Sequence, residues 1–166
     1  MASEGVDPAL VAALYRFAWA LVGEEAGALA LTQNVLAQDH RPTVLTRGSR
    51  AGEVALFSTA FRLHSGGETM PVPPVHDRVA IISALSLQHA EALRSDSLLK
   101  SFRKLELPQR AALVLFYTTQ CSLHDIAAVL RRSSEETVAI ISRGKAEWLH
   151  ILEQSGAREL PGQETP

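Results

Sequence analysis

Residues 107–152 read LPQRAALVLFYTTQCSLHDIAAVLRRSSEETVAIISRGKAEWLHIL, and this stretch decides the fold. Three helices are predicted within it, because each has a start signal and an apolar face. Pro108 opens the first helix, which is expected to run to about Thr118, before the polar residues 118–121 end it. The side chains predicted to face inward are Ala112, Leu113, Phe116 and Tyr117.

The second helix is predicted to begin at Ser122. Ser122 and Asp125 have the spacing of a capping box, in which a hydroxyl and a carboxylate bind the free backbone N–H groups of a helix start reciprocally. An apolar stripe follows at helical spacing, formed by Leu123, Ile126, Ala127 and Leu130. Residues 131–134, Arg-Arg-Ser-Ser, are the predicted turn after this helix.

The third helix repeats the same start signal with Ser133 and Glu136. One side of it presents Val138, Ile141, Trp148 and Leu152. A short helix, a tight turn and a longer helix form the helix-turn-helix layout. Capped amphipathic helices also occur in ordinary helical bundles, so spacing alone leaves both interpretations open.

The N-terminal half predicts further helices. Asp7-Pro8 combines a capping side chain with a proline suited to the first helical position, and Gly23 interrupts the helix that follows. A second helix is expected over residues 24–38, then a loop over 39–52 and a short helix over 53–63. Further along, residues 77–94 favour a helix by length, although Val79–Ile82 has strand propensity, and residues 96–104 favour another.

Glycines and prolines between Ser65 and Pro74 cannot continue a helix, and they mark the best linker in the chain. The sequence therefore predicts an all-α protein with two small helical domains, residues 1–64 and 79–154. A Gly/Pro-rich linker over residues 65–78 joins them. Residues 155–166 are predicted to be a disordered tail.

Composition narrows the classes of function. The 166 residues carry a formal net charge of -2, so there is no global attraction to nucleic acid, and any DNA contact must be local. A single cysteine, Cys121, excludes an internal disulfide and a cysteine-built zinc site. The N-terminus lacks the charges of a secretory signal, and no apolar run is long enough to span a membrane. We expect a soluble, cytoplasmic protein.

The residue identities resemble two regions of extracytoplasmic-function (ECF) sigma factors of the sigma-70 family. In the fourth region, the matching residues are Leu107-Pro108-Gln109-Arg110, Phe116-Tyr117, Ser122, Asp125-Ile126-Ala127, Leu130, Ser134, Thr137-Val138 and Arg143. In the second region, they are Leu14-Tyr15-Arg16-Phe17-Ala18, Leu21, Gly23, Leu31-Thr32-Gln33 and Val35, with fainter echoes at Leu56-Phe57 and Ala60. The resemblance covers about residues 8–64 and 98–152.

The resemblance implies a sigma region 2-like bundle that binds core RNA polymerase and a sigma region 4-like helix-turn-helix domain that reads promoter DNA. An anti-sigma factor would be a further partner. The residues implied in polymerase binding are Leu31, Gln33 and Asn34. Those implied in DNA binding are Arg131, Arg132, Ser134, Thr137, Arg143 and Lys145. For Arg131 and Arg132, a solvated helix end is the competing interpretation.

The chain departs from the family pattern where DNA contacts are expected. After Thr137-Val138, the family carries Lys, Ser and Arg, whereas this chain has Ala139, Ile140 and Ile141. Base and phosphate contacts need hydrogen-bonding or cationic side chains, so direct readout is reduced. Between residues 96 and 152 there are 8 basic and 6 acidic residues, a weak local excess for a DNA reader.

The same departures predict an alternative function, a degenerate sigma-like protein that binds an anti-sigma factor, a sigma factor or polymerase without reading DNA. Ile140 is a candidate contact for such a partner if it faces outward, and a core residue if the helix is rotated. A helix-turn-helix regulator of another type would leave the N-terminal resemblance as an accident. The family's second region also has acids where this chain has Ala30 and Asn34.

No catalytic constellation is visible in the sequence. The six histidines, His40, His64, His76, His89, His124 and His150, include no pair at the helical i, i+4 spacing of a metal motif. There is no phosphate-binding glycine loop and no nucleophile elbow. We expect no enzyme activity, no cofactor, no metal and no small-molecule substrate.

Overall fold

The computed structural model describes residues 7–38, 50–66 and 97–156, and every regular element among them is an α-helix. The predicted all-α class is confirmed. The helices are α1 (Pro8–Val22), α2 (Glu25–Gln38), α3 (Arg50–Ser65), α6 (Ser97–Phe102), α7 (Leu107–Thr118), α8 (Leu123–Leu130) and α9 (Ser134–Gly156). The helix predicted over 77–94, the linker from residue 67 and the tail from residue 157 lie outside the described residues.

Helix α1 has the start and the end that the sequence predicts. The Asp7 carboxylate accepts a hydrogen bond from the backbone N–H of Ala9 at 3.0 Å, and Pro8 follows at the first helical position. At the other end, Gly23 has a φ of 82°, and its N–H donates to the Trp19 carbonyl at 2.7 Å. Glycine adopts this left-handed conformation without a Cβ clash, so the chain turns there into α2.

Helix α3 is longer than the predicted segment 53–63. It begins at Arg50, inside the predicted loop, and ends at Ser65, the first residue of the predicted linker. Gly52, at the end of the predicted loop, is instead buried within the first turn of α3. The buried residues Leu56, Phe57, Ala60 and Leu63 recur along α3, and their packing offsets the cost of a helical glycine, about 1 kcal/mol.

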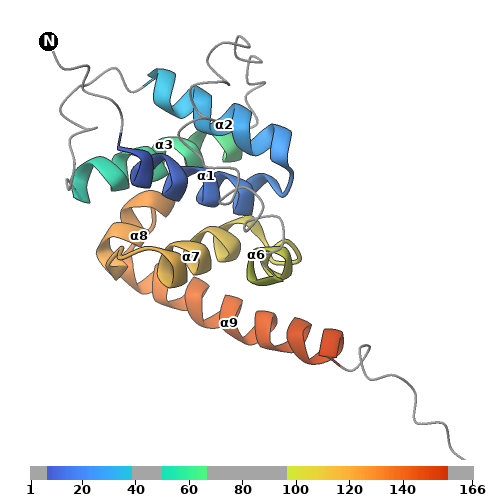
Figure 1. Ribbon diagram of the computed structural model, residues 1–166. Coiled ribbons are helices and arrows are strands. Elements are labelled where there is room, and N and C mark those ends of the chain that lie inside the picture. The colour runs from blue at the N-terminus through green and yellow to red at the C-terminus, as the bar shows by residue number, and fades with distance from the viewer. Residues whose placement is uncertain (1–6, 39–49, 67–96, 157–166) are drawn as a thin grey trace, which may run out of the picture.

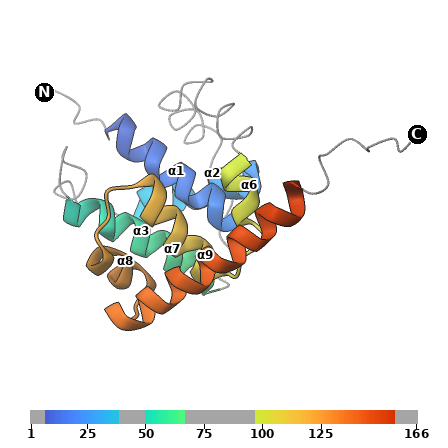
Figure 2. The ribbon, with the colours of Figure 1, turned by 90° about the horizontal axis from the view of Figure 1, so that it is seen from below.

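One hydrophobic core extends through both halves of the chain. Figure 1 and Figure 2 show α3 beside α8, and α1 packs against α7. The rings of Phe17 and Phe57 are 5.1 Å apart, in the same cluster as the fully buried Leu113 and Ile126 of the C-terminal half. The described helices on either side of the predicted linker therefore share a core, and the division into two domains stays a prediction.

The inward faces of α7 and α9 differ from the predicted ones. Phe116 and Tyr117, expected to point inward, are 44% and 45% exposed, and Val138 is 47% exposed. Leu123 and Leu152 are also exposed. The predicted inward residues Ala112, Leu113 and Ile141 are buried, and the rest of the core on these helices is formed by Ala111, Val114 and Leu115 of α7 and by Thr137, Ile140 and Gly144 of α9. The buried face of α9 is thus rotated from the predicted one by less than one residue, or less than about 100°, with Ile141 common to both faces.

Gly144 marks the closest crossing of α9 over α7. A Cβ at this position would lie 3.2 Å from Gln109 Cβ and from Leu113 Cδ1, tighter than an ordinary van der Waals contact.

Among the described helices, none has the length and apolar character needed to cross a membrane.

Replacing Gly144 with leucine is expected to lower the free energy of unfolding by about 1–3 kcal/mol, because the added side chain would overpack the crossing of α7 and α9. Urea denaturation followed by circular dichroism measures this change. Ala146→Leu, at an exposed position on the same helix, is the control and should change stability by less than about 0.5 kcal/mol. Equal effects of both substitutions would contradict the assigned crossing.

Candidate nucleic-acid interface

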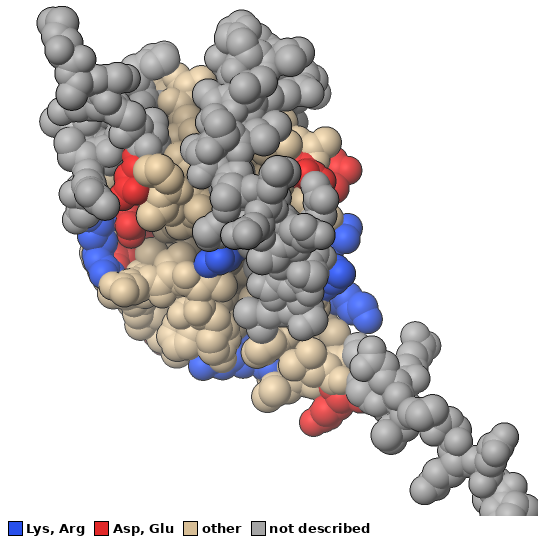
Figure 3. Space-filling model, in the orientation of Figure 1, with Lys and Arg blue, Asp and Glu red and all other residues tan. Residues whose placement is uncertain are grey.

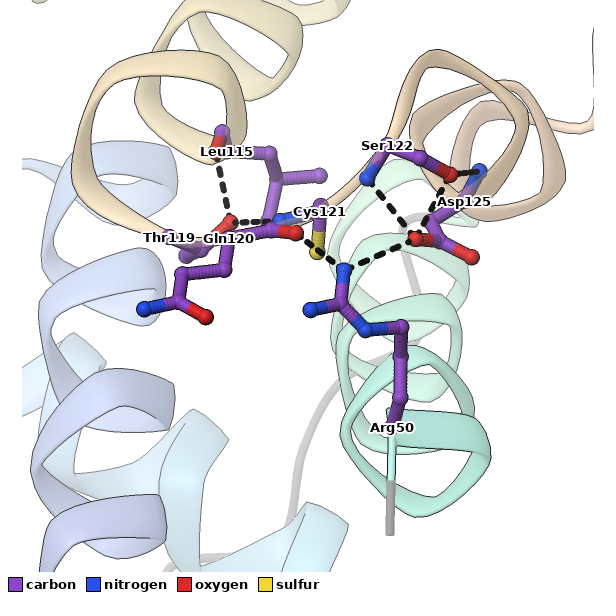
Figure 4. Close-up of polar contacts among 7 residues, drawn as sticks. All are labelled: Arg50, Leu115, Thr119, Gln120, Cys121, Ser122 and Asp125. Carbon is purple, nitrogen blue, oxygen red and sulfur yellow. Dashed lines mark hydrogen bonds and ion pairs between the residues drawn. The ribbon is translucent and has the colours of Figure 1, made fainter. Parts of the chain in front are cut away.

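Helix α8 begins with the predicted capping box. The N–H of Ser122 donates to Asp125 Oδ2 at 2.7 Å, and the N–H of Asp125 donates to Ser122 Oγ at 3.2 Å (Figure 4). The Ser122 hydroxyl also donates to the same carboxylate oxygen at 2.8 Å. These bonds hold the carboxylate in its charged form, so the pKa of Asp125 is lowered.

The turn after α8 closes at Arg131, which adopts the left-handed conformation with φ 54° and ψ 46°. Its N–H donates to the Ala128 carbonyl, and the N–H of Arg132 donates to the Ala127 carbonyl at 3.0 Å. Such bonds satisfy the last carbonyls of a helix, in a position where glycine is the usual residue. The predicted turn is confirmed, and an arginine occupies the position where glycine is usually found.

Helix α9 begins with the second predicted capping box. The N–H of Ser133 donates to Glu136 Oε2 at 2.9 Å, and the N–H of Glu136 donates to Ser133 Oγ at 3.1 Å. Hydrogen bonds from Ser133 lower the pKa of Glu136, and the charge of Arg132 adds to this effect. Helices α8 and α9 and the turn between them therefore form the expected helix-turn-helix unit.

The strain at Arg131 gives a direct test of the turn. We expect Arg131→Gly to raise the free energy of unfolding by about 1 kcal/mol, because glycine adopts a positive φ without the Cβ clash. Thermal unfolding in the calorimeter measures the gain. Arg132→Gly, one residue later, is the control and should give no such gain, because only Arg131 among the described non-glycine residues has a positive φ.

The structure exposes four of the six residues predicted to bind DNA. They are Arg131, Arg132, Ser134 and Arg143. Lys145 is half-buried, and its Nζ lies 4.5 Å from the ring centre of Phe116 and 5.5 Å from that of Tyr117. An ammonium group over aromatic faces is attracted to them, so Lys145 is partly engaged within the fold.

Two residues that the sequence assigned to partner contacts, Thr137 and Ile140, are buried in the structure. The Thr137 side chain is fully buried, and its hydroxyl donates to the Ser133 carbonyl at 2.8 Å, so it cannot contact DNA in this conformation. Ile140 is 9% exposed and belongs to the core, so the outward, partner-binding position is wrong and the rotated alternative is confirmed. Both follow from the rotation of α9, which turns this face toward α7 and α8.

Charges of both signs meet beside the arginines. Arg132 and Arg143 line a hollow of about 310 Å³ between the start of α7 and α9, and Glu106 and Glu136 line the same hollow. Two carboxylates offset two guanidinium charges there, which weakens the attraction of this hollow for a phosphate. On the face seen in Figure 3, basic and acidic residues form small groups, and at the left edge of the view a basic group lies directly beside an acidic one.

The residues predicted to bind polymerase do not form an exposed surface. Leu31 is fully buried in the core and Gln33 is 4% exposed, so neither side chain is available to a partner in this conformation. Asn34 is half-buried, and its amide donates to the Ala30 carbonyl at 2.8 Å. The Gln33 amide has no hydrogen-bond partner among the described residues. The correction applies to these side chains, while polymerase binding itself stays a prediction.

Arg50 is a residue that the sequence did not single out. It starts α3, and its Nη1 donates to the Gln120 carbonyl and lies 3.4 Å from Asp125 Oδ2 (Figure 4). A side chain of the N-terminal half thus binds the capped start of α8, 75 positions away in sequence. No local pattern predicts such a contact, because its partner is defined only by the tertiary fold.

The lowered pKa of Asp125 makes the α8 cap dependent on pH. The charged carboxylate stabilises the fold above its ordinary pKa of 3.8, and this contribution is lost as the pH falls through the lower folded value. Asp125→Asn should therefore be less stable at pH 7 and lose less stability than the wild type between about pH 5 and pH 2. Urea titrations across this range measure the difference.

Glu153→Gln removes an exposed acid near the end of α9 and serves as the control. A pH dependence that is the same in Asp125→Asn as in the wild type would show that Asp125 does not stabilise α8.

Cys121 lies beside the contact of Arg50 with Gln120 and Asp125 (Figure 4). It is half-buried and packs against the core. Burial, the largest effect, raises the pKa of its thiol, so the reactive thiolate is disfavoured. Within the described part of the chain, no group of three His, Cys, Asp or Glu side chains is arranged to hold a metal ion.

No family model matches the chain, and comparison with curated proteins and with solved structures gives no match. The functional argument therefore rests on the geometry of α8, the turn and α9.

Proposed function

We propose that this chain is a sigma-factor-like transcription protein that binds DNA through α8, the turn and α9 and acts together with core RNA polymerase. The observation that carries the proposal is the helix-turn-helix unit itself, two capped helices joined by a left-handed turn. This geometry supports DNA binding because the second helix of such a unit enters the major groove and the turn lies beside the phosphate backbone.

The exposed side chains define the kind of DNA contact. Arg131 and Arg132 extend from the turn, and Arg143 lies about two and a half helical turns into α9. Guanidinium groups bind phosphate oxygens with forked hydrogen bonds. Of the exposed α9 residues between them, Glu135, Val138 and Ala139 have no side-chain donor, and the only donors are the short hydroxyls of Ser134 and Ser142. We therefore expect binding dominated by phosphates, with little discrimination between sequences.

A second candidate follows from the same face of α9. Since Glu135, Val138 and Ala139 offer no cation, the unit also suits a regulator that binds polymerase, a sigma factor or an anti-sigma factor and does not read DNA. The two candidates differ in DNA affinity at low salt. Electrostatic binding to phosphates is strongest there, so its absence would favour the second candidate.

The deciding experiment measures the purified full chain against a labelled DNA duplex and against core RNA polymerase over a salt series. Binding to DNA that weakens steeply with salt, together with transcription that depends on polymerase, supports the proposed function. Polymerase binding without DNA binding at low salt supports the second candidate. Binding to neither partner would overturn the proposed function and the polymerase-binding form of the second candidate.

We expect the double variant Arg131→Gln, Arg132→Gln to reduce the slope of log K against log salt by about 2, since each phosphate contact contributes about one unit. Fluorescence anisotropy with a duplex measures the slope. Lys100→Gln removes an exposed cation outside the helix-turn-helix unit and is the matched control. An unchanged slope in the double variant would rule out phosphate contacts by the turn.

A further inference from the structure

The hollow between the start of α7 and the N-terminal half of α9 has the size of a small-ligand site. Its volume is about 310 Å³. Both ribbon views show α9 alongside α7 (Figure 1 and Figure 2). Small-molecule sites in proteins range from about 300 to about 1,000 Å³, so this hollow suits a ligand at the lower end, about as large as an amino acid.

One wall of the hollow is a single stripe of α9. Glu136, Ala139, Ile140 and Arg143 line it at spacings i, i+3, i+4 and i+7, so they share one face of the helix. The acid and the arginine are about 10 Å apart along the helix axis, seven residues at about 1.5 Å each. Two apolar residues lie between them. The stripe therefore offers a negative end, an apolar middle and a positive end.

The start of α7 and the turn before α9 complete the hollow. Glu106 and Pro108 line it from α7, together with Gln109. The N–H of Glu106 donates to Gln109 Oε1 at 3.3 Å, which fixes this first turn of α7. Arg132 lines the hollow from the turn. Two carboxylates, two guanidinium groups and an apolar surface thus line the same space.

These charged groups do not pair directly with one another. Among the described residues, the only ion pair lies at the start of α8. The guanidinium groups of Arg132 and Arg143 form no hydrogen bond with another described residue. Hydrogen bonds from Ser133 lower the pKa of Glu136, which keeps that carboxylate charged. Charges of both signs are therefore available to a ligand in the hollow.

We propose that this hollow binds a small zwitterion, a free α-amino acid with an aliphatic side chain. Arg132 and Arg143 donate forked hydrogen bonds to the ligand carboxylate, and Glu106 and Glu136 accept hydrogen bonds from the ligand ammonium group. The aliphatic side chain packs on the apolar surface between these charges. A ligand with both charges suits the mixed lining, whereas a simple anion or cation is repelled by one pair of groups.

The ligand shares two side chains with the proposed DNA contact. Arg132 and Arg143 are expected to bind phosphates, so a ligand carboxylate in the hollow competes with DNA for the same donors. This competition rests on the proposed function, whereas binding of the zwitterion does not. The hollow would thus let a small ligand lower the affinity of the helix-turn-helix unit for DNA.

The test titrates the full chain with leucine and follows the NMR shifts of the Ala139 and Ile140 backbone amides. We expect a dissociation constant of about 1 mM or tighter. N-acetylleucine, which lacks the ammonium group, and leucinamide, which lacks the carboxylate, should each bind about tenfold or more weakly. Leucine has no net charge, so it does not screen charges as a salt does. No shift at about 10 mM leucine, or equal binding of the capped forms, would overturn the site.

Matched variants separate the hollow from the rest of the surface. Glu136→Gln removes a charge but keeps an acceptor for the capping box of α9, so the fold is retained. It should weaken leucine binding about tenfold, whereas Glu135→Gln, exposed and outside the hollow, should not. Arg143→Gln should cause a similar loss, with Arg131→Gln as its control. Equal losses within either pair would overturn the site in favour of general surface electrostatics.

Fluorescence anisotropy with a labelled duplex tests the competition. Leucine at about ten times its dissociation constant should raise that of DNA about tenfold. If leucine binds and the DNA affinity does not change, the competition is overturned and the site is retained. If leucine binds but DNA does not bind at low salt, the proposed DNA binding fails and the site is retained. If DNA binds but leucine does not, the site fails and the proposed function is retained.

Discussion

The packing of α3 and α1 against α8 and α7 is the constraint on which the rest of the structure depends. Short helices bury too little apolar surface to be stable alone, and α8 has only eight residues. Its inner residues Ile126 and Val129 are buried in the cluster that contains Phe57 and Leu56 of α3. The helix-turn-helix unit is therefore built onto the N-terminal half, and its orientation is fixed by that half.

This constraint determines which surfaces are free. Helices α7 and α8 are covered by the N-terminal half on one side and by α9 on the other, so the turn and the outer face of α9 remain open. The face of α9 that packs inward takes Thr137 and Ile140 out of contact with any partner. The exposed residues there include a small set of arginines, the hydroxyls of Ser134 and Ser142, and apolar or acidic side chains of α9. The proposed DNA binding by this unit would consequently be electrostatic and dependent on salt.

Local chemistry made part of the structure predictable from sequence. The caps at Ser122 and Ser133 and the stop at Gly23 depend on residues within four positions of one another, so the sequence alone specifies them. The rotation of α9 was not specified, because Val138 and Thr137 compete for the inward position and the winner depends on the space beside Gly144 and α7. Burial of Ile140 follows from that rotation.

The candidate site also contains some features that local sequence predicts and others that only the tertiary fold specifies. Exposure of the turn arginines follows from the local cap and turn, so it was predictable. The contacts of Arg50 with Gln120 and Asp125 join positions 70 and 75 residues apart.

Arg131 gives the strongest argument that the turn faces a partner. An arginine in the left-handed conformation costs about 1 kcal/mol relative to glycine, which the Schellman-type turn would accept more readily. Its side chain is exposed and forms no hydrogen bond or ion pair with another described residue, so no contact within the described fold offsets this cost. Backbone strain that no contact within the described fold offsets points to a functional role for the strained residue. The exposed guanidinium in the turn between α8 and α9 supports the proposal of an anionic partner, and the phosphate backbone of DNA has that chemistry.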